Sequence, residues 1–335
     1  MKYLYTLTST SKDNYYEQFL LSLTSLKLLM PDAYVILLCD TITKDTLTGN
    51  RCEYKKMISE VITAEAPSSY SQIEVSRWIK TSIRRLIKGD FLFIDCDTVI
   101  SGDLSSIYDK KIVFGACLDK HLTLELHEKN NYIINNDKKL AFSSYKSNMH
   151  YNSGVIYCSD IPETYKLFDR WHELWQFSKK KKILRDQPAF NMAIYENSSI
   201  FTELDGTWNC QIAYNGLPYL SNSKIIHYFA TDTAFNESPF LLASENIFKI
   251  IKEKGNIPDN VLELLNDPKS AFVAKSQIIA GNALLYVINS DLFKFDVLLR
   301  KKIPFFFNIL NIICSFFKKI AKIFLIRSGK TNIYN

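Results

Sequence analysis

Hydrophobic and polar positions in the first third of the chain alternate between two patterns. Short apolar runs over residues 3–8, 33–39 and 91–94 predict strands, and the last run has the unbroken apolar character of a strand buried on both faces. Between these runs, apolar residues recur three or four positions apart over residues 15–30 and 73–87, which predicts helices. This alternation indicates a single open, mostly parallel α/β sheet flanked by helices.

The same reasoning extends to the rest of the chain. Apolar runs predict further strands over residues 112–117, 155–158 and 224–228. Helices are expected over residues 167–177 and across most of 240–299. Residues 184–191 are expected to open another helix, with Pro188 in its first turn. Polar composition predicts irregular structure over residues 118–150 and a turn at residues 152–154. The C-terminal part is therefore expected to form a helical appendage.

The end of the chain has its own pattern. Apolar residues recur at helical spacing from Ile303 to Phe324, with Asn and Lys residues on the opposite face. The apolar stretch over residues 303–317 is shorter than the roughly 20 residues that span a bilayer, and it is interrupted. Basic clusters flank it, which predicts a helix lying in the interface of an anionic membrane over residues 300–330. A helix docked on the main domain is the alternative.

Charge and cysteine content narrow the expected partners and cellular compartment of the protein. Eight of the 41 Lys and Arg residues lie in 300–335, which holds no Asp or Glu, so residues 1–299 carry 33 basic against 35 acidic side chains. This balance gives no support to a nucleic-acid partner. The seven cysteines are scattered without a CxxC pair, as expected for reduced thiols in a cytosolic protein. The first residues enter a strand at once, with no signal-peptide pattern.

Two carboxylates follow the buried run over residues 91–94. Asp95 and Asp97 are two positions apart, so their side chains point to the same side while Cys96 packs on the other. Unpaired charge is costly to bury, and ligands of open α/β sheets bind at the carboxyl ends of strands. We therefore expect both carboxylates to hold one Mn²⁺ or Mg²⁺. A strand-end turn with Asp97 as a helix cap is the alternative.

Several further segments accompany this pair in a fixed order. They are Val75-Ser76-Arg77-Trp78, His150-Tyr151-Asn152-Ser153-Gly154-Val155, Leu184-Arg185-Asp186-Gln187-Pro188-Ala189-Phe190-Asn191, Trp208-Asn209-Cys210-Gln211 and Lys224-Ile225-Ile226-His227-Tyr228. Together with Asp-x-Asp, the set resembles the family 8 retaining glycosyltransferases of the GT-A fold, from about residue 3 to about residue 230. The resemblance implies a nucleotide-diphospho-sugar transferase fold.

What the resemblance implies can be stated position by position. The metal ligands would be Asp95, Asp97 and His227. The UDP-sugar donor would be bound by Tyr15 (with Tyr16 as its rival), Arg77, Asp95, Asn152, Ser153 and Asp186. The catalytic residues would be Gln187, Asp186 and Asn152. Because the Gln187 amide is a poor nucleophile, retention favours front-face attack by the acceptor hydroxyl. Trp208 is expected in the core, and His121, His127, His150 and His172 are assigned to no site.

The expected activity is transfer of glucose or galactose from a UDP-sugar to a cell-surface glycan or glycolipid precursor, as in lipopolysaccharide biosynthesis. The enzyme would work as a peripheral protein on the inner face of the cytoplasmic membrane. The implied organisation is a GT-A catalytic domain over residues 1–240, a helical extension over 241–299 and the basic amphipathic tail over 300–335.

The resemblance departs from the family pattern after His227, where the family often has a glycine followed by Lys-Pro-Trp. Here the chain reads His227-Tyr228-Phe229-Ala230-Thr231-Asp232-Thr233. Lys224 or Arg77 would then replace the missing lysine, or phosphate binding would be weaker. Two other functions stay open. Residues 93–98 also fit the first motif of haloacid-dehalogenase-like phosphohydrolases, and a non-catalytic nucleotide-sugar binder would need no turnover.

Overall fold

A computed structural model describes residues 1–108, 111–229, 239–273 and 290–327 of the chain. It contains two compact units. The first comprises Met1–Ala230 and Phe240–Val273. The second contains helices α11 (Asp291–Lys302) and α12 (Pro304–Arg327).

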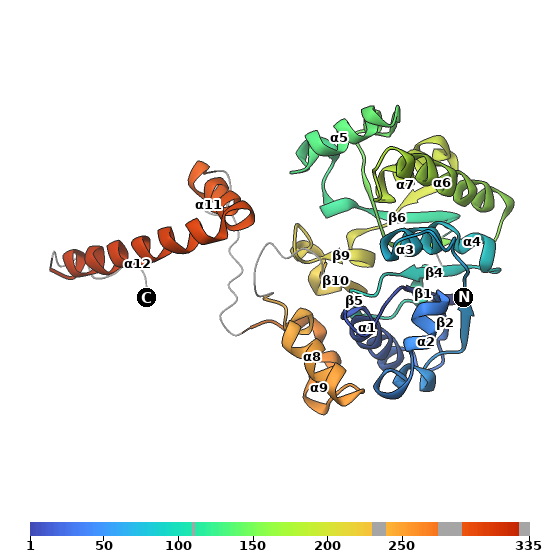
Figure 1. Cartoon of the computed structure of the whole chain (residues 1–335), viewed down its shortest axis with the longest axis horizontal. Helices are drawn as coiled ribbons and strands as arrows, with labels where there is room; N and C mark the ends of the chain where they lie inside the picture. The colour runs from blue at the N-terminus through green and yellow to red at the C-terminus, as the bar shows by residue number, and fades with distance from the viewer. Residues whose placement is uncertain (109–110, 230–238, 274–289, 328–335) are drawn as a thin grey trace. The chain divides into compact units, whose positions relative to one another are not determined.

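Seven strands form the main sheet of the first unit, in the order β3-β2-β1-β4-β7-β6-β8 (Figure 1). Their bounds are β1 Lys2–Leu7, β2 Tyr34–Cys39, β3 Glu60–Thr63, β4 Phe91–Ile94, β6 Phe114–Leu118, β7 Tyr151–Cys158 and β8 Phe201–Glu203. Only β7 runs antiparallel to its neighbours, and all other adjacent pairs are parallel. The predicted mostly parallel α/β sheet is confirmed.

A second, three-stranded sheet stands beside the first, and the hydrophobic pattern did not predict it as a separate sheet. It has the order β5-β10-β9, from β5 (Thr98–Ile100), β9 (Cys210–Gln211) and β10 (Ile225–His227). β10 pairs antiparallel with β5 and parallel with β9. These strands are short and far apart in the sequence, so only tertiary pairing assembles them.

Helices cover both faces of the main sheet (Figure 1). Their bounds are α1 Tyr15–Leu29, α2 Thr41–Thr46, α3 Gln72–Thr81, α4 Ile83–Leu86, α5 Asn130–Lys139, α6 Pro162–Lys180, α7 Gln187–Glu196, α8 Glu245–Lys254 and α9 Asp259–Asn266. Helices α3, α4 and α7 pack against α6, whereas α8 and α9 pack against α1. Helices α8 and α9 thus belong to the first compact unit, and the boundary expected at residue 240 stays a prediction.

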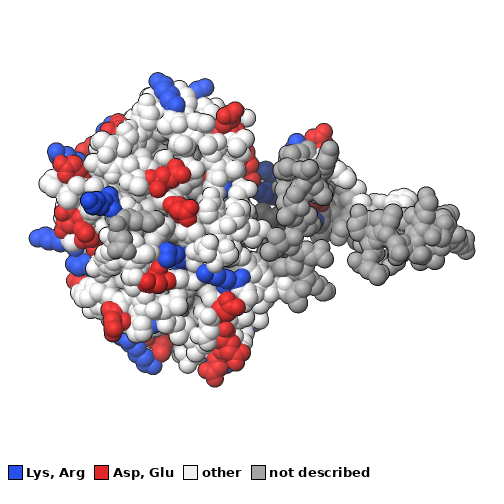
Figure 2. Space-filling model, turned by 180° about the vertical axis from the view of Figure 1, so that it is seen from behind, with Lys and Arg blue, Asp and Glu red and all other residues white. Residues whose placement is uncertain are grey.

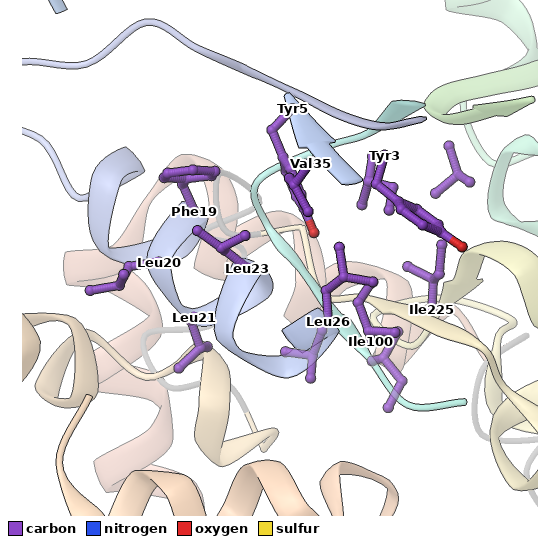
Figure 3. Packing of buried hydrophobic residues seen from close by; sticks show 14 of the residues in the cluster. Tyr3, Tyr5, Phe19, Leu20, Leu21, Leu23, Leu26, Val35, Ile100 and Ile225 are labelled. Atoms are coloured by element: carbon purple, nitrogen blue, oxygen red, sulfur yellow. The ribbon is translucent and has the colours of Figure 1, made fainter. Parts of the chain in front are cut away.

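Two hydrophobic cores follow from the alternation of side chains along the central strands. Tyr3 and Tyr5 of β1 face α1, where the rings of Tyr5 and Phe19 meet edge to face with centroids 5.4 Å apart (Figure 3). Leu4, between them, belongs to the core on the other face together with Trp171 of α6. The central strands thus bury both faces, and for this reason the sequences of β2 and β4 are apolar without interruption.

Two segments predicted as irregular contain regular structure. Residues 152–154, predicted as a turn, lie inside β7, where the Asp95 amide donates to the Gly154 carbonyl over 2.8 Å. This prediction was wrong because sheet pairing overrides the turn preference of Asn, Ser and Gly. Residues 118–150 contain α5, whose Ile133 and Leu140 are buried. Too few apolar residues point inward there for periodicity to reveal the helix.

The helix predicted over residues 73–87 is divided at Ser82 into α3 and α4. The Ser82 amide bonds to the carbonyls of both Trp78 and Ile79, so the last turn tightens. Thr81 also bonds through its hydroxyl to His172 Nδ1 of α6 at 2.8 Å. The helix that apolar spacing alone would continue therefore ends at this tightened turn, where the Thr81 hydroxyl also donates to the Arg77 carbonyl.

Charged side chains are mixed on the face of the main body shown in Figure 2, where acidic and basic groups lie among each other. Within the second unit, α12 exposes large apolar side chains, among them Phe305 at 76% and Ile312 at 70%. Among the described residues, no helix combines the length and the hydropathy needed to cross a membrane.

Candidate active site

Three predicted metal ligands lie together at the carboxyl end of β4. Asp95 and Asp97 directly follow that strand, and β5 begins at the next residue, Thr98. Because β5 pairs antiparallel with β10, Thr98 lies opposite His227. One ligand atom from each of Asp95, Asp97 and His227 lies within 4.8 Å of the others. Cys96 points away, and its thiol contacts the Thr6 carbonyl at 3.3 Å.

Asp97 and His227 form a pair of a half-buried carboxylate and a buried imidazole, with Nε2 3.2 Å from Oδ1. Burial acts to raise the pKa of Asp97, but the imidazole outweighs it and lowers that pKa below its usual value. Burial acts to lower the pKa of His227, whereas Asp97 and Asp95 raise it, with a net increase. The same two carboxylates that favour a proton on Nε2 would favour a metal cation there.

Asp95 has a buried cationic partner. The Lys80 ammonium, only 4% exposed as a residue, donates to Asp95 Oδ1 and Oδ2 at 3.1 and 3.2 Å. Burial still raises the pKa of Asp95, although Lys80 opposes the increase. The Asp95 and Asp97 side chains remain 29% and 20% exposed, so a ligand can reach them. Two carboxylates and one imidazole with this access fit a divalent ion such as Mn²⁺.

Gly154 of β7 leaves room for this cluster. A Cβ at this position would lie 2.6 Å from His227 Cε1, which is too short for a real contact, and 3.0 Å from Asp95 Oδ2, which is tighter than most real contacts. Its Cβ would also meet Asn152 Oδ1 at 2.8 Å. The residue is a glycine because two metal-ligand candidates and an amide approach the backbone here.

A second group of predicted residues surrounds the start of α7. The Asp186 carboxylate is buried, lies 3.1 Å from Arg77 Nε and accepts a bond of 3.2 Å from the Ser153 hydroxyl. Burial acts to raise its pKa, but Arg77 and Lys80 lower it below the usual value. Gln187 follows at the first position of α7 and donates from Nε2 to the Tyr151 carbonyl at 3.2 Å. Arg77, Ser153, Asp186 and Gln187 are thereby held by one another or by β7.

Asn152 lies in a line of buried polar side chains. Its Oδ1 accepts from the Gly154 amide at 2.8 Å and from Asn209 Nδ2 at 3.0 Å. Its Nδ2 donates to Asp119 Oδ1 at 2.9 Å. Asn209 in turn contacts His227 Nδ1 at 2.9 Å. Asn152 is therefore connected to the metal-ligand candidates as well as to β7.

The two rival tyrosines are separated by burial. Tyr15 begins α1 and is 39% exposed, so it can meet a ligand, whereas Tyr16 is 1% exposed and packs against Phe19 and Tyr54. Trp208 is in the core, as expected.

The two cations considered as substitutes for the missing lysine are both engaged. Lys224 donates to the Asp103 carbonyl at 2.9 Å, and Arg77 pairs with Asp186. Residues 230–233 of the altered segment lie outside the described residues.

Sequence reasoning missed three residues of this region: Lys80, Asn209 and Asp119. Lys80 had a detectable signal, since it lies one helical turn after Arg77 and thus on the same face of α3. Asn209 was noted only as part of a motif. Asp119 had no signal, because nothing in the local pattern after β6 indicates what its side chain meets.

Comparison with known proteins shows which family this chain is similar to. Residues 7–233 match the family model described as Glycosyl transferase family 8. In a comparison with curated proteins, none matched this chain. The apo structure of WbbM, a bifunctional glycosyltransferase, aligns at a TM-score of 0.52 and 15% identity over 80% of this chain and 51% of its own. The galactosyltransferase LgtC, in complex with donor and acceptor sugar analogues, aligns at a TM-score of 0.50 and 14% identity. This alignment covers 78% of this chain and 99% of LgtC. Mouse xyloside xylosyltransferase 1 aligns at a TM-score of 0.47 and 13% identity, over 68% of this chain and 98% of its own.

Proposed function

The chain belongs to glycosyl transferase family 8, with a GT-A fold, and from this membership we propose a retaining hexosyltransferase that uses a UDP-sugar and Mn²⁺ or Mg²⁺. The sugar would be glucose or galactose, and the acceptor a cell-surface glycan or glycolipid precursor. The observation that carries the proposal is the cluster of Asp95, Asp97 and His227 within 4.8 Å, next to the Arg77–Asp186 pair.

Each group of residues in the site would have a role in such a reaction. A divalent ion held by the cluster would stabilise the negative charge on the departing diphosphate. The buried Asp186 carboxylate, held by Arg77 and Ser153, can accept hydrogen bonds from sugar hydroxyls without reorganising. This arrangement supports the assignment of Arg77, Ser153 and Asp186 to the donor sugar, with Tyr15 exposed for the nucleotide base.

Gln187 is suited to facing the reacting carbon. Because its Nε2 donates to the Tyr151 carbonyl, the amide is oriented with Oε1 directed away from that carbonyl. An amide oxygen can stabilise an oxocarbenium-like sugar without becoming a nucleophile. The acceptor hydroxyl would then attack on the front face and pass its proton to the departing phosphate. Asn152 contributes by holding this part of β7 to Asp119 and Asn209.

A titration of the full chain with UDP tests the proposal. We expect the melting temperature to rise with UDP plus Mn²⁺ and to stay unchanged with UDP plus EDTA. A ligand at about 100 times its Kd adds about 2.7 kcal/mol to the free energy of unfolding. A screen of UDP-sugars then measures UDP release and the anomeric configuration of the product. Asp97→Ala is expected to abolish transfer while the circular dichroism spectrum stays the same.

The outcomes separate the alternatives. A shift with Mg²⁺ and a phosphate mimic but none with UDP would favour the phosphohydrolase. UDP binding without turnover on any UDP-sugar and acceptor would favour the non-catalytic binder.

The tail suggests where the enzyme works. The exposed apolar side chains of α12 and the basic end of α11 support peripheral attachment to an anionic membrane on the cytosolic side. This location would bring the site to a lipid-linked acceptor.

A further inference from the structure

A continuous line of hydrogen-bonded side chains runs through the first unit from the metal-ligand cluster to the start of α5. In order along the line, its members are His227 of β10, Asn209 of η8 (Gly206–Asn209), Asn152 of β7, and Asp119 and His127 from the chain that follows β6. Each residue is at most 8% exposed. Five polar side chains in one buried line are costly unless every bond is made, so their arrangement calls for a role.

The direction of the bonds near His227 is set by a backbone amide. The Gly154 N–H can only donate, so the atom of Asn152 that faces it is the amide oxygen. Asn209 also faces this oxygen, and therefore presents its NH₂ group to it. The oxygen of Asn209 is then the atom 2.9 Å from His227 Nδ1. Since that oxygen can only accept, Nδ1 carries the hydrogen, whether the imidazole is neutral or protonated.

A second backbone amide sets the direction at the other end. The Lys129 N–H donates to His127 Nδ1 at 3.0 Å, so Nδ1 is the acceptor and Nε2 is the nitrogen that donates. That Nε2 donates to Asp119 Oδ2 at 3.1 Å, while Asn152 Nδ2 donates to Asp119 Oδ1. Asp119 thereby receives a bond on each oxygen and anchors Asn152. The two ends give the same assignment for Asn152.

We propose that Asn209 is a positioning residue that fixes His227 with its hydrogen on Nδ1, so that Nε2 faces Asp97 and the divalent cation. Asn152 and Asp119 hold Asn209 in this orientation. The inference rests on the metal site of the proposed function. In the opposite tautomer Nε2 would carry the hydrogen and could not bind a metal, so the choice made at Asn209 decides whether His227 is a ligand.

Metal binding in the absence of a sugar donor tests this role. Free Mn²⁺ is titrated by electron paramagnetic resonance into the full-length wild type, Asn209→Leu and Asn209→Asp. Leucine removes the acceptor, and we expect Mn²⁺ affinity to fall by about 10- to 100-fold. Aspartate keeps an acceptor for Nδ1–H, and its affinity is expected to stay closer to that of the wild type. Thr164→Val is the control, because it removes a buried hydroxyl, with bonds to the Ser159 and Ile161 carbonyls, at the other end of β7.

The tautomer is read separately in ¹⁵N-histidine spectra of the Mg²⁺-loaded proteins, with His227→Gln to assign the signal among the 5 histidines. We expect the Nδ1–H form in the wild type and in Asn209→Asp, and a shift toward Nε2–H in Asn209→Leu. If Asn209→Leu does not fold, Asn209→Ser replaces it, because its shorter side chain withdraws the acceptor from Nδ1.

The outcomes keep this inference apart from the proposed function. Equal Mn²⁺ affinity and an unchanged Nδ1–H signal in Asn209→Leu would overturn the role of Asn209. Equal losses in Asn209→Leu and Asn209→Asp, with the Nδ1–H form kept in both, would also overturn it, since they would indicate a packing role only. A wild type that binds no Mn²⁺ would instead reject the metal site of the proposed function.

Discussion

At the scale of residues, Lys80 is a buried cation, and packing alone does not explain its burial. Its ammonium contacts both oxygens of Asp95 and lies 4.9 Å from the centre of the Phe93 ring. It also lowers the pKa of Asp186 as a secondary influence after burial and Arg77. Because this cation reduces the negative charge at Asp95, we expect Lys80, rather than Lys224 or Arg77, to favour the binding of a UDP diphosphate.

Lys80→Met tests this interpretation. We expect Mn²⁺ alone to bind more tightly, because a competing positive charge is lost, and UDP with Mn²⁺ to bind about tenfold more weakly, as for a lost bond to a charged group. Isothermal titration calorimetry measures both. Lys224→Met is the matched control, since the Lys224 ammonium bonds to the Asp103 carbonyl. Unchanged UDP affinity in Lys80→Met would contradict the expectation.

Gly154→Ala tests the close packing at the cluster. The added methyl group would lie 2.6 Å from His227 Cε1, so the imidazole or the β7 backbone must shift and the ligand cluster is disturbed. We expect a loss of Mn²⁺ affinity of more than about tenfold, comparable to removal of an outer-shell partner. In the control Gly115→Ala the methyl group meets the apolar side chains of Leu204 and Ile112, so stability falls while Mn²⁺ affinity persists. Equal affinity of Gly154→Ala and the wild type would show that the site tolerates the methyl group.

At the scale of elements, α5 contains a buried acid that makes stability depend on pH. Asp137 is 1% exposed, and burial raises its pKa to about 6, although the Ser144 hydroxyl opposes the increase. The folded state therefore binds this proton more tightly than the unfolded state, whose pKa is near 3.8. As pH rises from about 4 through 6, the folded state must lose a favoured proton, and stability falls.

Asp137→Asn removes this dependence. We expect both proteins to be similarly stable at pH 4 and the variant to be more stable at pH 8, by at most about 3 kcal/mol for a shift of roughly two pKa units. Urea denaturation at both pH values measures the difference. Asp45→Asn, at an exposed position of α2, corrects for the general effect of removing one charge. A difference that does not grow with pH would refute the expected linkage.

At the scale of the whole molecule, α12 sets the expected behaviour on membranes. Phe305, Ile312 and Phe316 are 76%, 70% and 60% exposed, and full burial of each side chain contributes roughly 1.5 to 3 kcal/mol. We expect the full-length protein to cosediment with vesicles containing anionic lipid, less so at high salt, and to lose at least about a hundredfold in affinity when all three are changed to Ser. Transfer to a water-soluble acceptor should persist. Equal vesicle binding by the triple variant would exclude this helix face as the contact.

The sequence by itself determined many of the elements, although not α5, the separate three-stranded sheet or the division of α3 from α4. The periodicity over residues 15–30, the apolar run over 91–94 and the spacing of Asp95 and Asp97 are local properties, which neighbouring residues specify without the rest of the fold. The order of motifs pointed to the family, and the family match over residues 7–233 confirmed it.

Tertiary structure alone decided which distant residues meet. The pairing of β5 with β10 brings His227 to Asp97, and the fold brings Lys80 to Asp95 and Asn209 to His227. No periodicity encodes these contacts, because each depends on how several separate elements pack. For the same reason the Asn152–Gly154 segment, a turn by residue preference, became part of β7, where the pairing of β7 with β4 outweighed that preference.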